Sequence, residues 1–282
     1  MSTPVWNPHF LERAALYSPL RRVGAALAHH DHWPDAHALN ALLAAQPVHT
    51  ESGARLRVVS QGEAAAAGAD RLAKKYEARI YRHGELQTRT QNWHDLFNLL
   101  AWLHFPRTKA RLNALHYREL LHASGHAANR SKLQDALTIF DEGGLIVAST
   151  DAQWLELIRT FQWKTLFWEQ RAAVVRDMRF YLFGHALYEK ALTPYKGLTA
   201  KAVLLQVPSA LFATDEATRI AHLDTATADW FGDGSALTST QMLAPVPILG
   251  IPGWDSANEH GDYYDDTEYF RSGYRRRDKR ES

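Results

Sequence analysis

The sequence has 282 residues, with 32 lysine and arginine side chains, 31 aspartate and glutamate side chains, and no cysteine. The lack of cysteine excludes disulfide bonds, thiolate zinc sites, cysteine-ligated iron–sulfur clusters and a cysteine nucleophile. Hydrophobic residues make up 46% and charged residues 22%, a balance that is typical of globular proteins and excludes an intrinsically disordered chain. The N-terminus lacks the features of a signal peptide, and the apolar runs are too short to span a membrane. We therefore expect a cytoplasmic protein without a membrane partner.

Charge is distributed unevenly along the chain. Residues 71–132 hold 12 basic and 4 acidic side chains, whereas residues 133–270 hold 9 basic and 19 acidic ones. Either the two segments pack together and neutralise each other, or the basic segment binds an anionic ligand such as phosphate, a nucleotide or nucleic acid. Residues 271–282 are basic again, and we expect a frayed, solvated tail there.

In the first half of the chain, prolines separate short predicted helices before residue 50. Pro34 stands at the first position of one that continues through residues 36–46. Residues 55–60 are predicted to form a short strand, and the alternation of residues 76–82 favours a strand or turn. Asn92 is a candidate cap for a helix over residues 93–105, and Pro106 starts a second helix that runs to about Leu121.

In the second half, two β-rich runs flank Asp141-Glu142-Gly143-Gly144, which predicts a β-hairpin near residues 135–149. Four helices are predicted after it, over residues 151–159, 164–176, 178–192 and 215–230. From Pro245, closely spaced prolines and glycines predict an extended C-terminal arm over the core. The sequence therefore predicts a mainly α fold with a small β element (α+β), in a single domain over residues 1–270.

The helix–proline–helix unit carries two stripes of polar residues. On the first helix, the imidazole of His94 and the amide of Asn98 share a face, and the carboxylate of Asp95 lies about 100° around the helix axis. On the second helix, the ammonium of Lys109, the amide of Asn113 and the imidazole of His116 lie at i, i+4 and i+7 and therefore share a face. If the helices pack antiparallel, the stripes converge and supply acid–base and anion-binding groups. The alternative is that the histidines are hydrogen-bonded in the core and the lysine is solvated. The candidate catalytic residues are His94, Asp95, Asn98, Lys109, Asn113 and His116.

Two other groups are candidate ligands for a divalent metal ion. Asp135 and Asp141 are six residues apart, on one face of the predicted hairpin strand, and Glu142 follows them. His185 and Glu189 are four residues apart on the predicted helix over residues 178–192. For the first group, the alternative is an ordinary hairpin turn. For the second group, the alternative is a pair of residues on the helix surface or in the core that binds no metal.

Nucleotide-binding glycine loops and the common motifs of zinc proteases and serine hydrolases are absent from the sequence. The polar stripes favour an enzyme, a hydrolase or one that handles phosphate. A non-catalytic nucleic-acid or nucleotide-binding protein is the alternative, and a structural or partner-binding protein is a third. The basic residues available to such an anionic ligand are Arg71, Lys74, Lys75, Arg79, Arg82, Arg89, Arg107 and Arg111.

Several runs of residues are similar to those of one family. They are NWHDLFN at 92–98, FPRTK at 105–109, LNALH at 112–116, FGHAL at 183–187 and LGIPGW at 249–254. Together they resemble the bacterial family named domain of unknown function 3025, from about Trp33 to Arg271. The resemblance implies one unit over most of the chain, and it brings no activity, cofactor, partner or catalytic residue with it.

Overall fold

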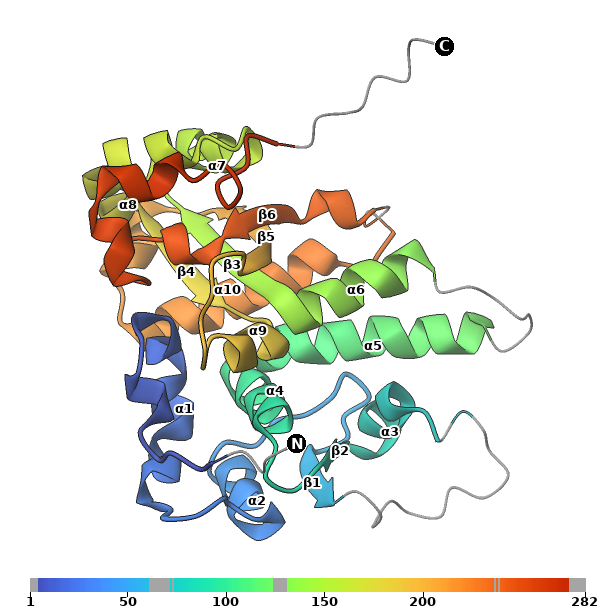
Figure 1. Cartoon of the computed structure of the whole chain (residues 1–282). Helices are drawn as coiled ribbons and strands as arrows, with labels where there is room; N and C mark the ends of the chain where they lie inside the picture. Colours follow the sequence, from blue (N-terminus) through green and yellow to red (C-terminus); the bar gives the residue numbers. More distant parts are fainter. Residues whose placement is uncertain are drawn as a thin grey trace, which may run out of the picture.

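The computed structural model of the chain describes residues 5–60, 72, 74–123, 131–235, 237 and 239–273. The fold is mainly α-helical with two small sheets, as the sequence predicts (Figure 1). The α-helices are α1 Arg21–Gly24, α2 Ala36–Ala45, α3 Tyr76–His83, α4 Trp93–His104, α5 Pro106–Ala123, α6 Lys132–Gly143, α7 Ala152–Arg159, α8 Arg171–Asp177, α9 His185–Lys190 and α10 Glu216–Phe231. In the part of the chain that is described, no helix combines the length and the hydrophobicity needed to cross a bilayer.

The larger sheet has four strands in the order β4-β3-β5-β6. Strand β3 pairs antiparallel with β4 and parallel with β5, and β5 pairs antiparallel with β6. Their bounds are β3 Gly144–Ser149, β4 Met178–Leu182, β5 Thr199–Gln206 and β6 Ala244–Pro247. The smaller sheet consists of β1 Arg57–Ser60 and β2 Glu85–Thr88, which run parallel.

Helices bury the central strand β3 on both faces. Leu145 and Val147 join a hydrophobic cluster that includes side chains of α7 and α8. Ile146 and Ala148 point to the opposite face, as alternation along a strand requires, and join a cluster with side chains of α5, α6 and α10. A strand covered on both sides has a continuous apolar sequence rather than an alternating one, and this explains the run GLIVAS.

The first residues of the chain pack onto α4. Trp6 stacks on Trp93 with ring centroids 5.4 Å apart, and Trp33 contacts both rings at 5.1 and 4.6 Å. All residues of α4 from Leu96 to His104 are buried. The helix that carries His94 is therefore held firmly by the core.

The helix–proline–helix unit is confirmed. The side chain of Asn92 accepts a hydrogen bond from the N–H of Asp95 and caps α4, and α5 begins at Pro106. The carboxylate of Asp224, on α10, accepts hydrogen bonds from the N–H groups of Arg107 and Thr108 at 2.9 and 2.8 Å. It thus satisfies donors that the first turn of a helix leaves without partners.

The prediction of a β-hairpin near residues 135–149 is wrong. Its first half is helix α6, which begins with a capping box formed by Ser131 and Gln134 and leads directly into β3 at Gly144. The buried residues Ala136, Leu137 and Phe140 follow helical spacing, which the β-rich composition hid. Only the second apolar run forms a strand.

Three other predictions need correction. Residues 76–82 form helix α3, and the parallel strand β2 follows at Glu85. The predicted helix over 178–192 is strand β4 followed, after Gly184, by the short helix α9. The C-terminal arm is not extended: it contributes edge strand β6 and then forms short 3₁₀ turns, the last of which buries Tyr263 and Tyr264. The predicted tail over 271–282 lies outside the described residues from 274 onward.

Candidate functional site

The candidate site lies where α4, α6 and α9 meet (Figure 1). Gly184 makes this contact possible because a Cβ atom there would lie 2.5 Å from the backbone of Glu142 and Gly143. The N–H groups of Phe183 and Gly184 both donate to the carbonyl of Gly144 at 2.9 Å. The start of α9 is therefore fixed against the end of α6, and His185 lies beside Glu142.

Three side chains from these helices converge. The Nε2 atoms of His94 and His185 lie 3.0 Å apart, and their rings meet edge to face. Oε2 of Glu142 lies 3.5 Å from Nε2 of His185 and 3.9 Å from Nε2 of His94. The side chain of His185 is only 4% exposed, whereas those of His94 and Glu142 are 27% and 43% exposed. The cluster thus has a buried inner side and an outer side that is open to solvent. We call these three residues the His–His–Glu cluster.

Each imidazole of the cluster has a carboxylate at its other nitrogen. Nδ1 of His94 lies 3.2 Å from Oε2 of Glu189, and Nδ1 of His185 faces Oδ2 of Asp141 across 3.6 Å. Such partners orient an imidazole and fix which nitrogen carries its proton. The two Nε2 atoms then face each other at hydrogen-bond distance, 3.0 Å, at the centre of the cluster.

Asp141 is itself held by a buried lysine. Nζ of Lys109 donates to Oδ1 of Asp141 at 2.6 Å and to Oδ1 of Asn98 at 2.8 Å. The Nδ2 group of Asn98 donates in turn to the hydroxyl of Tyr76, and Nζ of Lys109 lies 5.5 Å from the ring centre of Trp102. Lys109 and Asn98 therefore meet, as the convergence of the two stripes predicts, but they position Asp141 rather than face solvent.

The surroundings shift the pKa values of these groups in different directions. Burial lowers the pKa of His185 to about 3, so that its imidazole is neutral. The hydrogen bond to Glu189 and the nearby Glu142 raise the pKa of His94, although burial opposes them. Burial also raises the pKa of Glu142. For Asp141, burial acts against ionisation, but Lys109 and His185 outweigh it and the pKa lies below its usual value.

A small polar cavity lies behind the cluster. Nδ2 of Asn113 donates to Oε2 of Glu77 at 2.7 Å, while Oδ1 of Asn113 is buried and has no hydrogen-bond partner among the described residues. The cavity has space for about one water molecule, which Oδ1 could bind. Burial raises the pKa of Glu77. The residues that line the cavity are Tyr76, Glu77, Ile80, Asn98, Trp102, Lys109, Leu112, Asn113, His116 and Asp141.

Several predicted site residues lie elsewhere. His116 and Asn113 line the inner cavity, and His94 meets His185 instead of His116. Asp95 forms an ion pair with Arg89 at 2.8 Å. Asp135 and Asp141 belong to a helix, where six residues correspond to about 240° of rotation, so they do not share a face.

Sequence reasoning placed His94, Asp141 and the pair of His185 and Glu189 in three unrelated groups. The structure brings the three groups together. Glu142, considered only as a companion of the two aspartates, belongs to the cluster itself. No local signal joins these residues, because His94 and His185 are 91 positions apart in the sequence.

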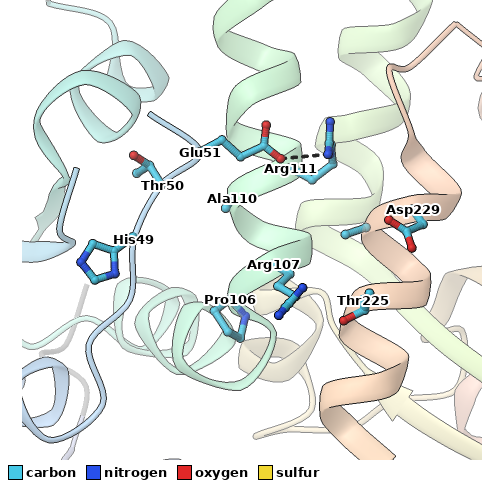
Figure 2. Close-up of a pocket in the computed structure, with 10 residues that line it drawn as sticks. His49, Thr50, Glu51, Pro106, Arg107, Ala110, Arg111, Thr225 and Asp229 are labelled. Carbon is cyan, nitrogen blue, oxygen red and sulfur yellow. Dashed lines mark ion pairs between the residues drawn. The ribbon is translucent and has the colours of Figure 1, made fainter. Parts of the chain in front are cut away.

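A second pocket, of about 280 Å³, lies against the face of α5 that carries Arg107 and Arg111 (Figure 2). Arg107 and Arg111 of α5 line it together with Thr225 and Asp229 of α10 and residues 49–51. Nε of Arg111 lies 3.0 Å from Oε1 of Glu51. The lining thus holds the carboxylates of Glu51 and Asp229 beside the two arginines, and the pocket lacks the uniform positive charge that favours an anion.

The basic segment also contains internal ion pairs. Arg79 binds Glu85 at 2.6 Å, and Arg89 binds Asp95 at 2.8 Å, so these acidic partners belong to the same segment. Lys109 links the basic segment to the acidic one through Asp141. Among the proposed phosphate contacts, Arg71 lies outside the described residues.

The family model for protein of unknown function (DUF3025) matches residues 56–275, so the chain belongs to this family. The match covers all residues of the His–His–Glu cluster and the carboxylates behind it. No match is found among curated proteins or among solved structures.

Proposed function

We propose that this protein is a hydrolase whose reaction takes place at the His–His–Glu cluster. The observation that carries the proposal is the 3.0 Å separation of the Nε2 atoms of His94 and His185, with a carboxylate oxygen of Glu142 beside them. Two imidazoles and a carboxylate that converge at one point, with His94 and Glu142 partly exposed to solvent, supply the groups by which a site binds and activates a water molecule.

The chemistry is the addition of water to an ester, amide or phosphoester. The oxygen of water bonds to the carbon or phosphorus atom, the bond to the leaving group breaks, and a proton of water ends on the leaving group. The cluster offers two ways to activate the water. An unprotonated Nε2 takes its proton, or a cation held by the three side chains makes the water more acidic. The hydrolase proposal requires one of these two routes of water activation, and it holds for either of them.

The charge around the cluster supports hydrolysis over the binding of nucleic acid. Glu142, Glu189 and Asp141 surround the two imidazoles, and the ammonium of Lys109 is buried against Asp141. A phosphate group would meet mainly negative charge here unless a cation were present. Direct binding of an anion by these side chains alone is therefore disfavoured.

The proposal is tested with a panel of chromogenic carboxylic esters, phosphomonoesters, phosphodiesters and anilides. For any substrate that the purified chain cleaves, we expect His94→Gln and Glu142→Gln each to lower kcat by a factor of about 10² or more. His222→Gln is the matched control, because His222 is exposed on α10. A panel without turnover, or His94→Gln at the rate of the unchanged protein, contradicts the proposal.

A further inference from the structure

We infer that His94, His185 and Glu142 form the binding site of one divalent transition-metal ion. Each residue offers one ligand atom, and these atoms all lie within 4.8 Å of one another. An ion about 2.0–2.1 Å from each of two imidazole nitrogens keeps those nitrogens about 2.8–3.4 Å apart, with the lower end at the right angle of octahedral coordination and the upper end at the tetrahedral angle. The 3.0 Å between the two Nε2 atoms falls within this range. Two imidazoles and one carboxylate with open positions are typical of catalytic Zn²⁺ and Fe²⁺ sites.

The groups behind the ligands support the same inference. In metal sites an imidazole ligand usually directs its second nitrogen toward a carboxylate or a carbonyl. Both histidines here do so, His94 toward Glu189 and His185 toward Asp141. His185 is 4% exposed, its Nδ1 has no hydrogen-bond partner among the described residues, and the carboxylate of Asp141 lies 3.6 Å from that nitrogen. With its proton on Nδ1, His185 directs the electron pair of Nε2 at the cluster.

Charge balance favours a cation at this point. The carboxylates of Glu142, Glu189 and Asp141 surround the imidazoles, while the ammonium of Lys109 faces them from the inner side and Lys190 acts on Glu142 at longer range. Carboxylate and imidazole ligands suit divalent first-row metals, and the lack of cysteine in the chain excludes a thiolate ligand. The outer side of the cluster, where His94 and Glu142 are partly exposed, leaves room for water or substrate on the ion.

The metal site deepens the proposed hydrolase function, since a bound divalent ion makes a coordinated water molecule acidic enough to lose a proton near neutral pH. The two proposals are nevertheless tested separately. If the chain binds the metal but hydrolyses no substrate, the metal-site inference stands and the hydrolase proposal is contradicted. If the chain hydrolyses a substrate but binds no metal, the hydrolase proposal stands and the metal-site inference is contradicted.

The test is a titration of the untagged full chain, first stripped with a chelator, with Zn²⁺ by calorimetry and with Co²⁺ by visible absorption. We expect one ion per chain and a cobalt spectrum of nitrogen and oxygen ligands. His94→Gln and Glu142→Gln each remove one ligand from a partly exposed position, so both variants are expected to fold and to bind at least 100-fold more weakly. Glu189→Gln changes only the partner behind His94 and should weaken binding by about 10- to 100-fold.

His222→Gln is again the control, because the chain has 15 histidines that could bind metal non-specifically. It should bind as tightly as the unchanged protein. Far-UV circular dichroism verifies that each variant is folded. The inference is overturned by the absence of stoichiometric binding, or by binding that His94→Gln and Glu142→Gln leave unchanged, which would identify adventitious metal on other side chains.

Discussion

Nζ of Lys109 lies 2.6 Å from Oδ1 of Asp141, and this ion pair connects α5 to α6 directly behind His185. The side chain of Lys109 is 4% exposed and that of Asp141 21%. A charge buried this deeply is tolerated only when it is paired. The pair therefore serves both the stability of the fold and the orientation of His185.

Replacement of the lysine tests this dual role. We expect Lys109→Met to lower the free energy of unfolding by about 3 kcal/mol, because it leaves the carboxylate of Asp141 without its partner. Urea denaturation followed by circular dichroism measures the change. The double variant Lys109→Met/Asp141→Leu should recover most of the loss, since it removes both charges. A single variant as stable as the unchanged protein would show that solvent, and not Lys109, balances Asp141.

The contact between α6 and α9 depends on Gly184. In Gly184→Ala the new methyl group would lie 2.5 Å from the backbone of Glu142 and Gly143, so we expect a loss of about 1–3 kcal/mol and a displaced His185. Gly143→Ala is the matched control, because a Cβ atom there meets nothing within 4 Å. Thermal unfolding of the two variants separates them. Equal effects would argue against the close approach at Gly184.

Asp224 links α10 to the first turn of α5. Its side chain accepts hydrogen bonds from the N–H groups of Arg107 and Thr108, and burial raises its pKa. Asp224→Ala leaves two donors unsatisfied, and we expect a loss of about 2 kcal/mol in the free energy of unfolding. Asp229→Ala, at an exposed position on the same helix, should change stability by less than about 0.5 kcal/mol. If both variants unfold at the same urea concentration, Asp224 does not cap α5.

His104 gives a pH dependence that can be isolated. It is 3% exposed, neither ring nitrogen has a hydrogen-bond partner among the described residues, and burial lowers its pKa to about 3. The unfolded chain takes up a proton at His104 below its ordinary pKa of about 6.5, whereas the folded chain does so only near pH 3. Stability from this residue is therefore complete above pH 6.5 and is lost as the pH falls toward 3.

His104→Leu removes this pH dependence. Between pH 7 and pH 5, the unchanged protein should lose about 2 kcal/mol more than the variant, which corresponds to one proton over about 1.5 pH units. The comparison uses the difference between the two proteins because other groups, such as His185, titrate equally in both. Parallel pH profiles would mean that His104 gains a proton as easily in the folded chain as in the unfolded one.

The local parts of the fold could be predicted from the sequence. Asn92 and Pro106 mark the ends of α4 and α5, and the helical spacing of Asn98 and Lys109 allows the contact that the structure contains. Local signals failed where tertiary packing decides the outcome. The β-rich residues before Gly144 form a helix because their apolar side chains face the core with helical spacing.

The candidate site could be predicted only in pieces. His94 and the pair of His185 and Glu189 were visible as polar residues on helices, but the register that joins them depends on the sheet. Strands β3 and β4 pair antiparallel, with Leu145 opposite Leu182, and this pairing brings the end of α6 beside the start of α9. Long-range pairing of this kind leaves no trace in local periodicity.

The wide spacing of the three cluster residues also bears on how the protein matures. During synthesis His94 emerges first, Glu142 follows 48 residues later, and His185 completes the set 91 residues after His94. A nascent chain cannot hold the complete set until β4 has docked beside β3, so any cofactor loading must come after that step. Truncated translation products that end before β4 would lack the cluster however well their helices form.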